Sequence, residues 1–213
     1  MKERKISASL WSADMANLQN AIERVDKYVD SYHFDLMDNH YVPGFLFSSP
    51  IIKTLRSFTK KEFEVHLMCE NPENLVEELI DAGADVLMFH LNTFTDLMTL
   101  IKDTKAKGVK TGVVLNVDEP IELAIPYLAE IDVIVLMGTA IGIKGADFNE
   151  VTYEKITKLS KMCEENNVLI QIDGGIRNHT VPKMIQCGGN VITAGSLLFG
   201  NDYEEITKWY KNL

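Results

Sequence analysis

The chain has 213 residues, 46% of them hydrophobic and 24% charged, which is typical of one globular domain, so we expect a single domain over residues 1–213. The formal net charge is −10 and no apolar run approaches the roughly 20 residues of a bilayer span, so we expect neither nucleic acid nor a membrane as a partner. Three cysteines without C-x-x-C spacing, Cys69, Cys163 and Cys187, favour reduced thiols and a cytoplasmic location.

Short apolar segments rich in branched residues recur along the chain, each followed by a longer segment with helical spacing. The predicted strands cover residues 6–10, 32–36, 62–68, 86–90, 111–115, 133–137, 169–173 and 191–194. The predicted helices cover residues 18–29, 49–56, 72–82, 94–107, 121–128, 149–166, 180–187 and 203–213. Eight strands alternating with eight helices predict an α/β fold whose parallel sheet closes into a (β/α)8 TIM barrel. An open doubly wound sheet is the alternative, but no G-x-G-x-x-G fingerprint follows the first strand.

Polar side chains interrupt the apolar pattern near the carboxyl ends of three predicted strands. His33 and Asp35 lie two residues apart on one face of the second strand, His66 lies in the third, and Asp173 ends the seventh. A single buried histidine is more often a hydrogen-bonded core residue than a metal ligand, and a single aspartate at a strand end is often a helix cap. Because active sites of this fold lie at the carboxyl ends of the strands, the four together predict a divalent transition-metal site. His90 is a weaker candidate, since its own strand carries no carboxylate partner.

Glycines follow each of the last three predicted strands and mark a second candidate site. Loops at these positions commonly bind phosphate through backbone N–H groups, and glycine permits a close approach. Tight turns are the alternative for any one glycine, but three adjacent loops favour a phosphate. The candidate residues are Gly142, Gly145, Gly174, Gly175, Gly195 and Ser196.

Six stretches of the sequence resemble the ribulose-phosphate 3-epimerase family. They are SASLWSAD (7–14), HFDLMDNHYVPG (33–44), VHLMCENPE (65–73), AGADVLMFH (82–90), QIDGGI (171–176) and AGSLLFG (194–200). The resemblance spans nearly the whole chain. It implies a metal-dependent isomerase that inverts carbon 3 of a phosphorylated ketose and forms a homo-oligomer.

The resemblance also implies roles for individual residues. His33, Asp35, His66 and Asp173 match the ligands of one divalent metal ion, for which zinc, iron, cobalt and manganese all suit the mixed nitrogen and oxygen set. Asp35 and Asp173 match the acid/base pair as well. Ser9 and His66 match substrate-binding residues. Met37, Met68 and Met137 match methionines beside the reacting carbons, with core packing as the alternative.

The loop after the sixth strand departs from the family pattern. The family reads close to M-S-V-N-P-G-F-G-G-Q, whereas residues 137–146 read MGTAIGIKGA, and Lys144 either adds a cation beside the phosphate or points into solvent. The resemblance makes D-ribulose 5-phosphate, converted to D-xylulose 5-phosphate, the leading substrate, and the altered loop motivates six-carbon D-allulose 6-phosphate as the alternative. A barrel lyase and a non-catalytic sugar-phosphate sensor are the alternatives of other classes.

Overall fold

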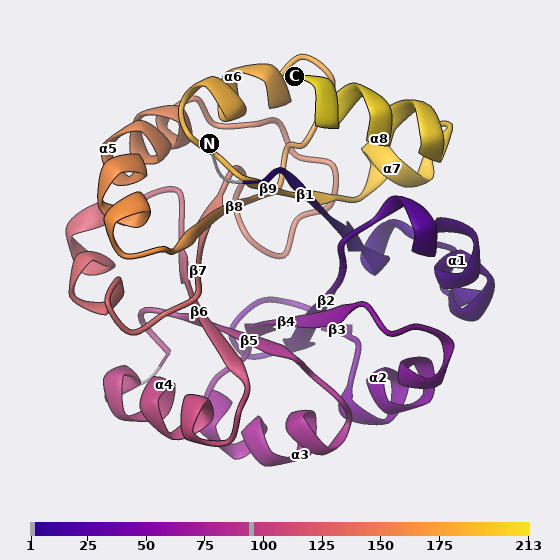
Figure 1. The fold of residues 1–213 in the computed structure, drawn as a ribbon. Coiled ribbons are helices and arrows are strands. Elements are labelled where there is room, and N and C mark those ends of the chain that lie inside the picture. Colours follow the sequence, from indigo (N-terminus) through magenta and orange to yellow (C-terminus); the bar gives the residue numbers. More distant parts are fainter. Residues whose placement is uncertain (1–2, 94–95) are drawn as a thin grey trace.

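Eight parallel strands close into a barrel in the computed structural model, which describes residues 3–93 and 96–213 (Figure 1). Hydrogen bonding follows the order β1-β9-β8-β7-β6-β5-β4-β2, and β1 pairs with β2 to complete the ring. A short strand, β3 (Phe45–Leu46), adds to β2 in antiparallel orientation. The barrel strands are β1 Lys5–Ser9, β2 Ser31–Asp38, β4 Glu62–Met68, β5 Val86–His90, β6 Lys110–Leu115, β7 Val133–Met137, β8 Leu169–Asp173 and β9 Val191–Ala194.

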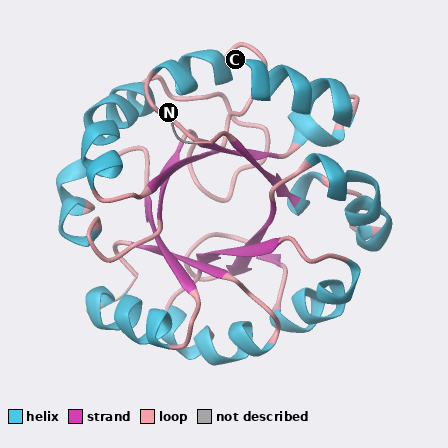
Figure 2. Ribbon diagram, viewed as in Figure 1, coloured by secondary structure: helices cyan, strands magenta, loops and turns pink. Residues whose placement is uncertain are grey.

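Helices surround the strands as an outer ring (Figure 2), which confirms the predicted TIM barrel. Gly83, Gly108 and Gly188 follow helices with φ of +95°, +82° and +112°, the left-handed conformation expected just past a helix end. Among the described residues, no helix combines the length and apolar composition that a membrane span requires. The α-helices are α1 Leu18–Val25, α2 Ser49–Leu55, α3 Val76–Asp81, α4 Leu97–Ala106, α5 Val151–Glu165, α6 Val181–Gln186, α7 Ser196–Phe199 and α8 Tyr203–Asn212.

The helix predicted over residues 121–128 is wrong. Two 3-10 turns, Ile121–Leu123 and Ile125–Tyr127, stand in its place. Pro126 lacks the N–H that an α-helix would use there, so the segment turns in short pieces. The helix expected from residue 72 begins as a 3-10 turn and becomes α3 only at Val76, and α7 was not predicted. The predicted start of α4 at Phe94 lies outside the described residues.

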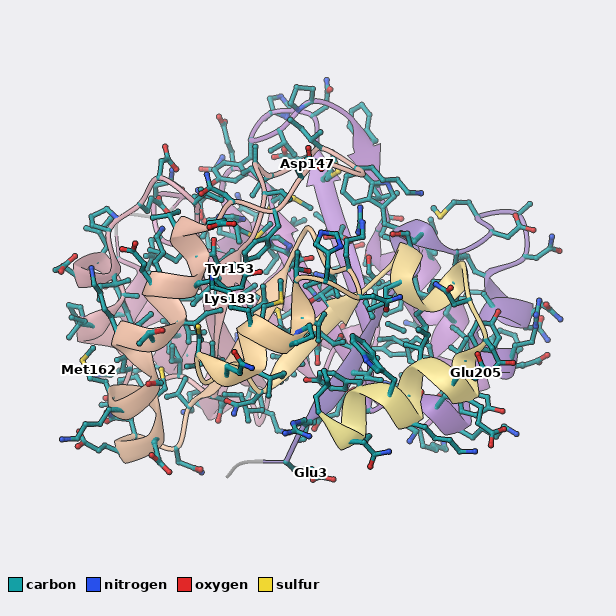
Figure 3. All side chains as sticks on the ribbon, turned by 90° about the horizontal axis from the view of Figure 1, so that it is seen from above. Glu3, Asp147, Tyr153, Met162, Lys183 and Glu205 are labelled. Carbon is teal, nitrogen blue, oxygen red and sulfur yellow. The ribbon has the colours of Figure 1, made fainter. Side chains whose placement is uncertain are left out.

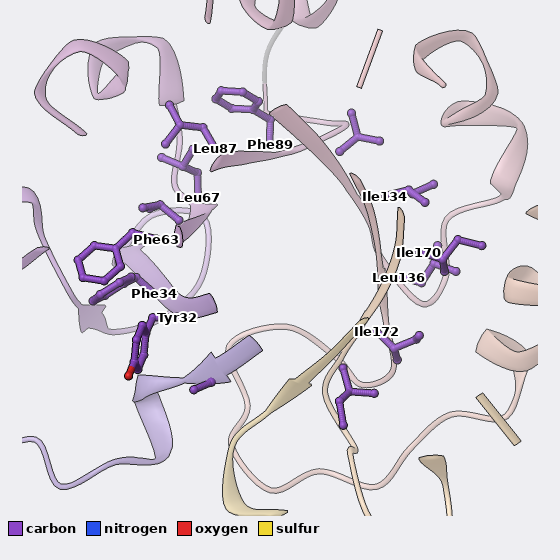
Figure 4. Packing of buried hydrophobic residues seen from close by; sticks show 14 of the residues in the cluster. Tyr32, Phe34, Phe63, Leu67, Leu87, Phe89, Ile134, Leu136, Ile170 and Ile172 are labelled. Atoms are coloured by element: carbon purple, nitrogen blue, oxygen red, sulfur yellow. The ribbon is translucent and has the colours of Figure 1, made fainter. Parts of the chain in front are cut away.

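Each strand presents alternate residues to the helices and to the barrel interior. Outward side chains such as Phe34, Phe63 and Ile134 join the large hydrophobic core beneath the helices (Figure 4). The interior is divided. Strands β5, β6 and β7 fill their side with an apolar cluster of Val86, Met88, Val114, Val133, Val135 and Met137. The other strands, together with His90 at the end of β5, contribute buried polar side chains, namely Ser7, Ser9, His33, Asp35, Glu64, His66, Gln171 and Thr193.

Candidate metal centre and adjoining pocket

The four predicted ligands lie together inside the barrel, near the carboxyl ends of β2, β4 and β8. Strand register explains part of this convergence, because Asp35 pairs with His66 across β2 and β4. One potential ligand atom from each of His33, Asp35, His66 and Asp173 lies within 4.8 Å of the others. Asp173, the last residue of β8, brings its carboxylate to the same place from across the barrel.

The distances within this group leave nitrogen atoms of both rings without hydrogen bonds. Nε2 of His33 is 3.4 Å from Oδ1 of Asp35 and 3.5 Å from Oδ2 of Asp173, while Nδ1 of His66 is 3.4 Å from both oxygens. Both imidazoles are fully buried, and these nitrogens have no hydrogen-bond partner. An unsatisfied buried polar group costs about 1–3 kcal/mol. A cation between the four atoms would satisfy all of them, so the residues fit a divalent metal.

The charges of the four residues also favour a bound cation. Burial alone lowers the pKa of His33 and His66, but the carboxylates of Asp35 and Asp173 outweigh it and raise both pKa values. Burial raises the pKa of Asp35 and Asp173, and the two imidazoles outweigh it and lower both. The buried carboxylates therefore favour positive charge between them, carried either by protonated imidazoles or by a bound cation.

Two further buried residues, Glu64 and His90, lie against the ring nitrogens of His33 and His66 that point away from the two aspartates. The sequence prediction did not assign a role to Glu64 and ranked His90 low. Oε2 of Glu64 lies 3.5 Å from Nδ1 of His33, and Nε2 of His90 lies 2.8 Å from Nε2 of His66. Glu64 is a charged residue two positions from His66 in an apolar strand, so alternation was a signal for it. His90 was ranked low for want of a carboxylate on its own strand, but its partner lies on the neighbouring strand β4.

A pocket of about 280 Å³ opens above the four-residue group. It joins the candidate metal ligands to the glycine loops that were predicted to bind phosphate. Two predicted residues do not line it: His33 lies beneath, and Met37 packs against Met68 and Val42. The predicted residues that line the pocket are Ser9, Asp35, His66, Met68, Met137, Gly142, Lys144, Gly145, Asp173, Gly174, Gly175, Gly195 and Ser196.

Loops from opposite sides of the barrel meet over this pocket. Val42, after β2, contacts Gly142, after β7, closely enough that a Cβ on Gly142 would lie 3.0 Å from its Cβ. Lys144 is exposed, and its Nζ donates a hydrogen bond of 3.0 Å to the backbone oxygen of Trp11. This hydrogen bond connects the altered loop to the segment after β1. In the side view, Asp147, which follows the altered loop, lies at one end of the molecule and Glu3 at the other (Figure 3).

Arg177 adds a second cation to the pocket that the sequence prediction did not include. The side chain is half-buried after β8, and its Nη1 donates to the backbone oxygen of Ile176 at 2.9 Å. Its backbone N–H donates to Oγ1 of Thr180 at 3.0 Å. Lys144 and Arg177 thus belong to the glycine-containing loops after β7 and β8, and they line the same pocket as Asp35 and Asp173.

Asp38 anchors the loop that carries Val42. Its Oδ1 accepts hydrogen bonds from the backbone N–H groups of His40 (2.8 Å) and Tyr41 (3.0 Å), and its Oδ2 accepts one from that of Glu70 (2.7 Å). Burial raises the pKa of Asp38, but these donors outweigh it and lower the pKa below the usual 3.8. The carboxylate therefore organises, in its ionised form, the loop whose Val42 lies against Gly142 of the pocket.

Replacing Asp38 by Asn is expected to lower the free energy of unfolding by about 1–2 kcal/mol at pH 7, because the new amide group faces the N–H of Glu70. A depressed carboxyl pKa stabilises the fold above the unfolded value of about 3.9, and this contribution is lost as pH falls through the folded pKa. Urea unfolding of both proteins between pH 7 and pH 3 measures the difference. A gap that widens toward acid pH would contradict this account.

Comparisons with known proteins show which proteins this chain resembles. A sequence profile described as the ribulose-phosphate 3 epimerase family matches residues 5–199. The chain is 35% identical to ribulose-phosphate 3-epimerase of Bacillus subtilis over 200 residues, 92% of each protein, and 34% identical to that of Methanocaldococcus jannaschii over 212 residues, 98% of this chain and 89% of the relative. A solved 3-keto-L-gulonate-6-phosphate decarboxylase from Vibrio cholerae is similar in fold, with a TM-score of 0.78, 14% identity and coverage of 99% and 97%.

Proposed function

This chain belongs to the ribulose-phosphate 3-epimerase family, and we propose that its substrate is D-ribulose 5-phosphate, which it interconverts with D-xylulose 5-phosphate. It is thus an isomerase that acts on a carbohydrate. The observation that supports the proposal best is the convergence of Asp35 and Asp173 with two buried imidazoles at the base of the pocket. Two carboxylates reach the pocket from strands on different sides of the barrel.

Inverting a carbon next to a ketone requires that a proton leave one face and another arrive on the opposite face. A pair of carboxylates is the simplest device for this. In our proposal one of Asp35 and Asp173 takes the proton from carbon 3 and the other returns one to the opposite face. Oγ of Ser9 lies 3.2 Å from Oδ2 of Asp35 and donates a hydrogen bond that orients this carboxylate. Met68 and Met137 line the same pocket with surface that cannot exchange protons.

His33, Asp35, His66 and Asp173 would hold one divalent metal ion. When bound, such an ion offsets the negative charge that develops on the substrate oxygens as the proton leaves. Nitrogen and oxygen ligands together suit zinc, iron, cobalt or manganese. The buried carboxylates and bare ring nitrogens described above support this assignment.

The glycine loops and the two cations of the pocket would hold the phosphate group. Gly174 and Gly175 follow β8 with φ of +88° and +69°, a conformation that few other residues adopt, and both line the pocket. Gly195 and Ser196 line the same pocket. Lys144 and Arg177 would add positive charge there. The sugar would then extend from the phosphate end of the pocket to the carboxylates.

A panel of phosphorylated ketoses tests the substrate assignment. We expect kcat/KM for ribulose 5-phosphate to exceed that for allulose 6-phosphate by about 10-fold or more, because one extra carbon in a pocket of fixed size commonly changes selectivity by roughly 10–200-fold. The altered loop from Met137 to Ala146 supports the six-carbon alternative. A higher kcat/KM with the six-carbon sugar would therefore reassign the substrate.

The same assay separates the other classes of function. An epimerase exchanges the carbon 3 proton with deuterated solvent and leaves every carbon–carbon bond intact, whereas a lyase releases a shorter product and a sensor binds without turnover. We also expect a homo-oligomer, which light scattering on the purified chain would test.

A further inference from the structure

We propose that Glu64 and His90 are positioning residues that fix the tautomers of His33 and His66, so that each ring offers an unprotonated nitrogen to the metal ion. The inference rests on the proposed metal site and extends it to a second layer of residues. Neither Glu64 nor His90 is among the four ligand residues.

The two rings enter the four-residue group by opposite nitrogens. His33 directs Nε2 toward Asp35 and Asp173, and His66 directs Nδ1 toward the same carboxylates. A metal ion binds the nitrogen that carries the lone pair, so the remaining proton of each neutral ring must lie on the other nitrogen. For His33 that nitrogen is Nδ1, and for His66 it is Nε2. These are the two atoms that face Glu64 and His90.

Glu64 presents a carboxylate oxygen to Nδ1 of His33. It lies opposite His33 in the β2–β4 register, and Oε2 is 3.5 Å from Nδ1. Oγ of Ser7 (2.6 Å) and Nε2 of Gln171 (2.9 Å) donate hydrogen bonds to the same oxygen. Because a hydroxyl and an amide carry no charge, these two donors hold the carboxylate in place without neutralising it. The result is a carboxylate–histidine pair directed at the ligand group.

His90 does the equivalent for His66 with a neutral acceptor. Its Nε2 lies 2.8 Å from Nε2 of His66, and both rings are fully buried. If His66 donates through Nε2, then His90 must accept through Nε2 and carry its own proton on Nδ1. The ring of Tyr41, in the loop after β2, packs against that of His90, with 4.8 Å between the ring centroids and an angle of 45° between the planes. One contact therefore fixes the tautomers of two histidines.

Outer contacts of this kind raise the basicity of a ligating ring and restrict its rotation, and their removal typically costs 10–100-fold in metal affinity. The test is a competition titration of metal-free full-length protein against a chromogenic chelator with Zn²⁺. We expect Glu64→Gln to bind Zn²⁺ about 10–100-fold more weakly than the wild type. Glu64→Asp keeps the charge and is expected to recover part of that loss.

Glu62→Gln is the matched control, because Glu62 lies on the same strand but pairs with exposed Lys110 at the surface. It should bind Zn²⁺ as the wild type does. Urea unfolding in the presence of EDTA checks that each variant folds without metal. Should Glu64→Gln fail to fold, Glu64→Asp takes its place in the test, and wild-type affinity in both Glu64→Asp and His90→Phe overturns the proposal.

For His90, substitution by Gln keeps an acceptor for the Nε2 proton of His66, and substitution by Phe removes it. Only His90→Phe is expected to weaken Zn²⁺ binding 10-fold or more, and it should also alter the visible spectrum of the Co²⁺-loaded protein, which reports ligand geometry. Equal affinities for the wild type, Glu64→Gln and His90→Phe would overturn the inference while leaving the metal site intact. A wild type that binds no Zn²⁺ would instead overturn the metal site itself.

Discussion

Asp173→Asn is expected to lower kcat for epimerisation by about 10³-fold or more while the barrel stays folded. Asparagine has the same shape but neither accepts nor returns a proton at neutral pH, and general acid–base catalysis contributes roughly 10²–10⁴-fold. The substitution also removes one of two carboxylates from the proposed metal group. Both effects lower the rate, so the assay is run at saturating metal to isolate the loss of the proton carrier.

The matched control is Asp103→Asn, at an exposed position of α4, which should retain the wild-type rate. Hydrogen–deuterium exchange at carbon 3, followed by NMR, measures proton transfer directly. Asp35→Asn should show a comparable loss, since each carboxylate serves one face of the sugar. If Asp173→Asn turned over ribulose 5-phosphate at near the wild-type rate, the two-carboxylate mechanism would be wrong.

Removing divalent metal is expected to lower activity by about 10²–10³-fold. Stabilisation of a developing oxyanion by a metal ion contributes several kcal/mol, and each 1.36 kcal/mol corresponds to a factor of ten in rate. The measurement compares protein dialysed against a chelator with the same protein after addition of zinc, iron(II), cobalt or manganese salts. Recovery with one or more of these ions is the expected result, and the most effective ion identifies the metal that suits the site.

Thermal unfolding gives an independent test of metal binding, because a ligand that binds only the folded state raises its stability by about 2.7 kcal/mol at a concentration of 100 Kd. The melting temperature should therefore rise when metal is added back to the wild type. His66→Ala removes a ligand and should abolish that rise. Full activity after complete metal removal, with no change in melting temperature on addition, would refute the proposed ligand set.

The barrel was predictable because its signals are local. Each strand is a short run of branched apolar residues, and glycines such as Gly83 and Gly188 mark helix ends through a conformation that few other residues adopt. The segment from Ile121 to Leu128 misled the prediction because its apolar spacing suits a helix, whereas Pro126 in its middle breaks one. The pair of residues that forms β3 is too short to produce a pattern.

The candidate site was predicted only in part, for a different reason. His33, Asp35, His66 and Asp173 stand out as polar residues within otherwise apolar strands, a pattern that can be seen in each strand by itself. The contact between His66 and His90 depends on which strands are neighbours and on their register, and no single strand contains that information. Arg177 and the contact from Lys144 to Trp11 likewise depend on where distant loops meet over the barrel.

The divided interior of the barrel determines where this protein tolerates redesign. The side filled by Val86, Val114 and Val135 packs without any of the proposed ligands, so it can hold the scaffold together while the opposite side is changed. A library that randomises inward positions of β1, β2, β8 and β9 therefore samples new chemistry on a constant support. A polar substitution at Val135 would instead place an unsatisfied polar group in the apolar cluster and destabilise the scaffold.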